Sequence, residues 1–71
     1  MKKIFEIPVY NEEVREIVRA GRSHNTLEDS WADMHLIEIR AHTAGEAMEI
    51  CRRKHPEKMG FVLGDAAESV A

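Results

Sequence analysis

Residues 35–54 read HLIEIRAHTAGEAMEICRRK, and this stretch decides the fold class. Apolar and polar side chains alternate over 35–41, which indicates a strand with one buried face. The tetrapeptide that follows shortly after, Thr43-Ala-Gly-Glu46, matches a capping box at the start of a helix. An apolar stripe then runs to near Lys54, and a proline two residues later cannot continue the helix. The stretch therefore predicts a strand followed by a helix.

A similar unit lies nearer the beginning of the sequence. The segment Lys3–Val9 alternates as a strand should. Asn11 is a favourable N-cap for a helix over Glu12–Ala20, and Gly21 stands where a left-handed C-cap residue belongs. Pro8 has no N–H group to donate to a strand ladder, so we expect it at the end of the strand or on an exposed edge.

A third strand is predicted over Gly60–Gly64, a short apolar run between glycines. The order β-α-β-α-β predicts a small two-layer α+β domain over residues 1–64, with a three-stranded sheet and both helices packed on one face. Residues 65–71 are small and acidic, and we expect them to form a flexible tail. The second sheet face carries mixed residues and could be solvated or meet another subunit; these are Ile4, Glu6, Leu36, Glu38 and Arg40.

The composition indicates one small globular domain without covalent or metal staples. Of the 71 residues, 44% are apolar and 32% are charged, which is ordinary for a globular protein. A chain of this length buries only roughly 60% of its unfolded surface, so its core is thin. The single cysteine, Cys51, cannot form an internal disulfide, and no CxxC pair indicates structural zinc. Because small domains without staples often gain stability by self-association, a homodimer is one expectation.

Charge and hydropathy argue against two classes of partner. The formal net charge is −3, whereas a dedicated nucleic-acid binder carries a basic face that neutralises phosphates. No apolar run approaches the ~20 residues of a membrane span, and the first ten residues lack the apolar core of a signal peptide. The lone thiol fits a reducing compartment. We therefore expect a soluble cytoplasmic protein with no membrane partner.

The polar run over residues 22–34, RSHNTLEDSWADM, is long for a connection in so small a domain. Its middle part predicts a short helix over Leu27–Asp33, in which Leu27 and Trp31 lie together at i, i+4. We interpret the pair as a flap that docks on the core. The alternative is that Trp31 is an exposed anchor for a partner, because Trp is enriched at binding hot spots.

The same run offers a candidate ligand set. Histidine is the commonest metal ligand, and the run could fold together His24, Asp29, Asp33 and His35. Their spacing matches no established metal-binding pattern. We therefore assign no metal and no cofactor, and keep metal or small-ligand binding by residues 22–35 as an alternative function.

Basic residues form two groups, one along the first helix and one at the end of the second. The first group comprises Arg15, Arg19 and Arg22, and the second comprises Arg52, Arg53 and Lys54. Cations at a helix C-terminus offset the partial negative charge there, which explains the second group structurally. Weak contact with nucleic acid is a further alternative, although no RNA-binding motif is present.

No set of residues with catalytic spacing is found. Cys51 and His55 are four residues apart on the second helix, the spacing of a thiol beside an imidazole. However, Cys51 falls at the centre of the apolar stripe, where a free cysteine usually acts as packing. We therefore expect that the protein is not an enzyme. The leading interpretation is a small non-catalytic interaction or accessory module that self-associates.

Overall fold

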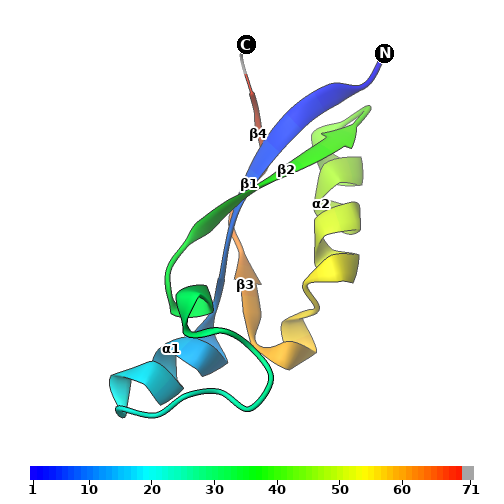
Figure 1. Ribbon diagram of the computed structural model, residues 1–71. Helices are drawn as coiled ribbons and strands as arrows, with labels where there is room; N and C mark the ends of the chain where they lie inside the picture. Colours follow the sequence, from blue (N-terminus) through cyan, green and yellow to red (C-terminus); the bar gives the residue numbers. More distant parts are fainter. Residues whose placement is uncertain (70–71) are drawn as a thin grey trace.

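The computed structural model describes residues 1–69 and contains an antiparallel sheet with β1 at its centre (Figure 1). One edge of β1 pairs with β2 over the whole of β2, and the other edge pairs with β3 and β4. The strands are β1 (Lys3–Asn11), β2 (His35–Ala41), β3 (Phe61–Leu63) and β4 (Ala67–Glu68). The helices are α1 (Glu12–Arg19) and α2 (Ala44–Lys54), and the 3₁₀ turns are η1 (Asp29–Ala32) and η2 (Glu57–Met59).

The predicted α+β class is confirmed, and the two helices take different positions in it. α2 lies along the sheet beside β2, whereas α1 continues from the end of β1 and lies next to η1 (Figure 1). The core is formed where α2 covers the sheet, and the alternating pattern of β1 supplies much of it. Its buried members are Phe5, Ile7, Val9, Ile39, Ala41, Ala47, Cys51 and Phe61.

The buried side chain of Asn11 joins three elements. Its Oδ1 atom accepts a hydrogen bond from the Val14 N–H at 3.0 Å, as predicted for the N-cap of α1. Its Nδ2 group donates to the Met59 carbonyl oxygen at 3.0 Å, which ties η2 to the end of β1. The neighbouring Glu12 N–H donates to the Gly60 carbonyl oxygen at 2.8 Å. A polar side chain with no exposed surface therefore holds the α1 start against the approach to β3.

The other predicted helix ends are also confirmed. Gly21 has a φ angle of +76°, and the Arg22 N–H donates to the Ile17 carbonyl oxygen at 3.0 Å, which closes the C-terminus of α1 in a Schellman arrangement. At the start of α2, the Thr43 hydroxyl accepts a hydrogen bond from the Glu46 N–H at 3.1 Å. Local sequence is therefore sufficient to set these boundaries.

Pro8 is not at a strand end or an exposed edge, so that prediction is wrong. It lies within the central strand, opposite Leu36 of β2. On its other side its carbonyl oxygen accepts a hydrogen bond from the Gly64 N–H at 2.7 Å. The pairing register moves by one residue between Val9↔Leu63 and Glu6↔Ala67, which defines a bulge between β3 and β4. Proline has no N–H group to donate to the ladder. At Pro8 this costs little, because the bulge already interrupts the ladder there.

The predicted flexible tail over 65–71 also needs correction. Residues Ala67 and Glu68 form β4, the Ser69 N–H donates to the Ile4 carbonyl oxygen at 2.8 Å, and the Lys3 Nζ atom lies 3.4 Å from a Glu68 carboxylate oxygen. Small and acidic side chains give little burial, but backbone groups can still pair with the long edge of β1. Residues 70 and 71 lie outside the described part of the chain.

Candidate functional site

Trp31 packs inward from η1 against the core. Its ring centroid lies 5.2 Å from that of Phe61, which it meets edge-on, and 4.6 Å and 5.6 Å from those of His35 and His55. Leu27 packs against the same core cluster. The predicted flap is therefore confirmed, although its helical part is shorter than Leu27–Asp33 and is a 3₁₀ turn. The alternative in which Trp31 is an exposed anchor receives no support from this packing.

His24 organises the loop that leads to η1. Its Nδ1 atom lies 3.1 Å from the backbone nitrogens of both Thr26 and Leu27, so it accepts their hydrogens. Its Nε2 atom lies 2.9 Å from a Glu13 carboxylate oxygen and therefore carries the proton. Both ring nitrogens therefore make hydrogen bonds within the fold, and the bond to Glu13 attaches the loop to α1.

We expect His24→Ala to lower the free energy of unfolding by about 1–2 kcal/mol. The backbone N–H groups of Thr26 and Leu27 would lose their acceptor, and the Glu13 carboxylate would lose its donor. Trp31 fluorescence during urea unfolding reports both stability and docking of the flap. His42→Ala is the matched control, because His42 is exposed and makes no side-chain hydrogen bond within residues 1–69. Equal effects of the two substitutions would contradict a structural role of the His24 ring.

The candidate ligand set of the polar run does not converge on a site. His35 places its Nε2 atom 2.8 Å from the Ser30 carbonyl oxygen, and Asp29 accepts a hydrogen bond from the Ser23 hydroxyl at 3.4 Å. Asp33 is exposed. Within residues 1–69, no group of three or more His, Cys, Asp or Glu side chains is arranged to hold a metal ion. Sequence proximity alone suggested this set.

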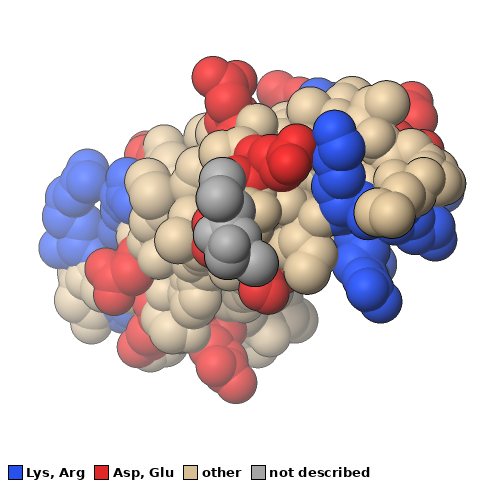
Figure 2. All heavy atoms as spheres, turned by 90° about the horizontal axis from the view of Figure 1, so that it is seen from above, with Lys and Arg blue, Asp and Glu red and all other residues tan. Residues whose placement is uncertain are grey.

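The two basic groups do not form one surface. Arg15 is used by the fold, because its guanidinium lies 3.8 Å above the centroid of the Tyr10 ring and its Nε–H donates to the Ala32 carbonyl oxygen at 2.9 Å. Arg19 and Arg22 lie at the far end of α1, and the other group is at the end of α2. On the face in Figure 2, Lys and Arg form separate groups on opposite sides, with acidic and uncharged residues between them.

The geometry around Cys51 opposes thiolate chemistry. The thiol is buried, and burial raises its pKa, with Lys54 and Arg52 acting in the opposite direction. The Sγ atom lies 3.7 Å from the His55 Nδ1 atom. The same Nδ1 atom lies 3.0 Å from the Cys51 carbonyl oxygen and so carries a proton that it donates there. This nitrogen cannot also accept the thiol proton, and the prediction of a core cysteine is confirmed.

The raised pKa of Cys51 predicts a pH dependence of stability. The folded state holds the thiol proton more tightly than the unfolded state, so stability is fully present below the unfolded pKa of about 8.5 and falls as the pH rises above it. Urea unfolding between pH 7 and pH 10 should therefore show a steeper alkaline loss for the natural chain than for Cys51→Ala. Parallel pH profiles for the two chains would refute the linkage to this thiol.

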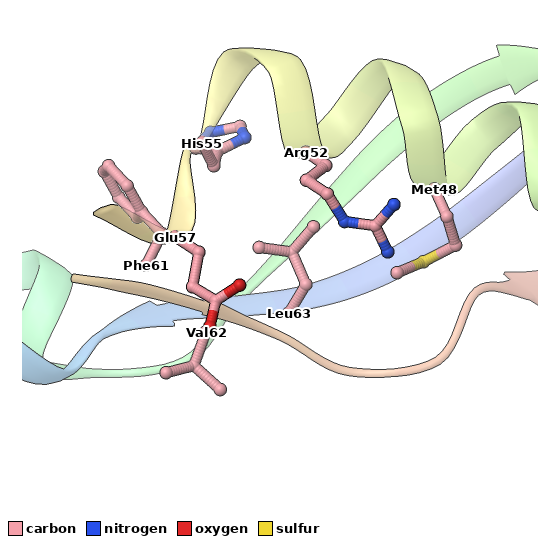
Figure 3. A pocket seen from close by; sticks show the side chains of 7 residues that line it. All are labelled: Met48, Arg52, His55, Glu57, Phe61, Val62 and Leu63. Atoms are coloured by element: carbon pink, nitrogen blue, oxygen red, sulfur yellow. The ribbon is translucent and has the colours of Figure 1, made fainter. Parts of the chain in front are cut away.

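A groove of about 260 Å³ lies between α2, η2 and β3 (Figure 3). In Figure 3, the side chains of Arg52 and Glu57 lie on either side of Leu63. The sequence gives no sign of this groove, because its walls come from elements that only the tertiary fold brings together. The remaining lining residues are Met48, His55, Phe61 and Val62. It is smaller than most ligand pockets, which measure ~300–1,000 Å³.

The sheet face turned away from α2 is open in the single chain. Leu36 is 63% exposed, and Ile4 and Val62 are 39% and 40% exposed. Glu6 and Glu38 stand directly opposite each other on neighbouring strands. Like charges in this position destabilise a sheet.

β2 is an edge strand, because the strand order is β2-β1-β3. Among the described residues, no strand pairs with its outer edge. The sequence does not reveal this feature, since strand order depends on pairing between distant segments. This edge borders the open face through the exposed side chains of β2.

Comparisons with protein-family models, curated proteins and solved structures gave no match for this chain. Within residues 1–69, none of the helices has the length and apolar character needed to span a bilayer. The interpretation of function therefore depends on the geometry described above.

Proposed function

We propose that this chain is a small non-catalytic interaction module that associates with a second copy of itself. The observation that carries the proposal is the unpaired outer edge of β2 beside an open sheet face with Leu36 and Ile4 exposed. Unpaired strand edges with adjacent apolar residues are templates for pairing with another chain.

The energetics of a small domain support this proposal. Its buried core consists of one layer of side chains between α2 and a narrow sheet, and a core of this size rarely supplies more than ~3–5 kcal/mol of stability. Association would bury further apolar surface without a disulfide or metal. A reducing compartment such as the cytoplasm suits the buried free thiol of Cys51.

The other functions considered from the sequence have less support. Both ring nitrogens of His24 are engaged by the fold, which weakens metal or ligand binding by the polar run. Nucleic-acid binding is weakened because Arg15 is engaged by the fold and the other basic residues lie at the ends of two different helices, whereas phosphate neutralisation requires a continuous basic face.

Light scattering coupled to size-exclusion chromatography tests the proposal directly. We expect a mass that rises from monomer to dimer with concentration, up to about 1 mM, where even weak association is visible. Leu36→Ser, on the open face beside the edge, should weaken the dimer. Met59→Ser is the matched control, because Met59 is also exposed but lies on η2, away from β2. A strictly monomeric chain over the whole range would refute the proposal.

A further inference from the structure

We infer that the second copy pairs antiparallel along the outer edge of β2, in the register whose twofold axis passes through Ile39. This inference rests on the proposed self-association and specifies its contact. The partner is another copy of this chain, and the joined sheets would carry both α2 helices on the same side.

The backbone of β2 determines which residues point hydrogen-bonding groups outward. The Ile4 and Pro8 carbonyl oxygens of β1 accept hydrogen bonds from the β4 and β3 side. In an antiparallel sheet, the N–H and C=O groups of one residue point to the same neighbouring strand. The even-numbered β1 residues therefore face β3 and β4, and the odd-numbered β1 residues bond to β2. Their partners in β2 are the odd-numbered residues, including Ile37 and Ile39. The outward groups therefore belong to Leu36, Glu38 and Arg40.

Side-chain charge then selects one of the symmetric registers centred in β2. An axis through Glu38 would place the two Glu38 carboxylates opposite each other, which is repulsive. An axis through Ile37 would place Glu38 opposite Leu36. An axis through Ile39 places Glu38 of each copy opposite Arg40 of the other. This register forms two cross-strand ion pairs and keeps the outward backbone groups in hydrogen-bonded pairs.

The edge also lacks the usual devices that block such pairing. β2 contains no proline, and its pairing with β1 runs without a bulge. Glu38 and Arg40 are both exposed, and neither forms an ion pair within residues 1–69. Charges on an edge normally prevent pairing, but opposite charges two residues apart become complementary when the strand pairs antiparallel with itself.

Charge reversal at the two positions tests the register. In the inferred dimer, Glu38→Arg brings Arg opposite Arg twice, and Arg40→Glu brings Glu opposite Glu twice. Each variant alone should dimerise about 10- to 100-fold more weakly than the natural chain. An equimolar mixture of the two should form a heterodimer, because every Arg then faces a Glu. The double variant E38R/R40E should likewise recover dimerisation.

Sedimentation equilibrium of each chain and of the mixture gives the dissociation constants, and circular dichroism confirms that the variants are folded. Glu49→Arg, an exposed reversal on α2, is the matched control and should dimerise as the natural chain does. A monomeric natural chain would overturn both the inference and the proposed function. A dimer that both single variants leave unchanged, or weakened variants that do not recover on mixing, would overturn the register alone.

Discussion

Replacing Asn11 by alanine should lower the free energy of unfolding by about 2–4 kcal/mol. The side chain has no exposed surface, caps α1 through its Oδ1 atom and donates to the Met59 carbonyl oxygen through Nδ2. Alanine removes both hydrogen bonds and leaves the Val14 N–H and the Met59 carbonyl without a partner. In a domain of this size the melting temperature should fall by about 4–8 °C per kcal/mol, which calorimetry measures.

Two further variants separate the roles of Asn11. Asn11→Asp keeps an acceptor for the cap but loses the donor to Met59, so it should retain α1 and still destabilise the connection to β3. Asn25→Ala is the matched control, because Asn25 is exposed and has no side-chain hydrogen bond in the described chain. If Asn11→Ala costs no more than Asn25→Ala, the buried amide does not hold these elements together.

Replacing Gly60 by alanine should be comparably damaging, at about 2–4 kcal/mol, because it combines a backbone cost with a steric one. Gly60 has a φ angle of +93°, outside the range that L side chains readily adopt. A Cβ atom there would lie 2.8 Å from both Asn11 Oδ1 and Glu13 Cβ. The clash falls on the same buried cap, so the start of α1 or the turn before β3 must move. Urea unfolding followed by Trp31 fluorescence measures the loss.

Two other glycines, Gly21 and Gly45, separate the two costs at Gly60. Gly21 shares a positive φ angle, +76°, but a Cβ atom there would meet no atom within 4 Å, so Gly21→Ala should show the backbone cost alone, about 1 kcal/mol. Gly45 lies in α2 and would meet only the Thr43 hydroxyl at 3.9 Å, so Gly45→Ala should stabilise by about 0.5–1 kcal/mol. A Gly60→Ala loss no larger than that of Gly21→Ala would refute the steric argument.

Features that depend on neighbouring residues were predictable from the sequence. Asn11 and Thr43 cap their helices as expected, and Gly21 ends α1. In each case a side chain bonds to a backbone group within three residues, or a left-handed residue follows a helix, so no knowledge of distant contacts is needed. The alternation over Lys3–Val9 predicted a strand correctly for the same reason.

Features that depend on distant pairing were not predictable. Pro8 resembles an edge residue until its neighbour on the sheet is known, because only the bulge opposite it makes the missing donor harmless. Residues 67–68 resemble a tail because their side chains carry no pattern, and their pairing is made by backbone groups alone.

The candidate site divides in the same way. Docking of Leu27 and Trp31 on the core was predicted, and the structure confirms it. The double backbone contact of the His24 ring was not predicted, because an isolated histidine in a polar run gives no sign of which atoms it meets. The exposed edge of β2 was not predicted because it follows from strand order alone.

The central position of β1 has a consequence for how the chain reaches its native state. Asn11 pairs with Phe61 and Phe5 pairs with Glu68. The second edge of β1 can therefore be paired only after β3 and β4, which come much later in the chain, have been synthesised. Contacts of such high sequence separation slow folding. During synthesis β1 and β2 would therefore exist as an incomplete hairpin with two open edges. The time that a nascent chain spends in this state, rather than its final stability, would set its exposure to aggregation.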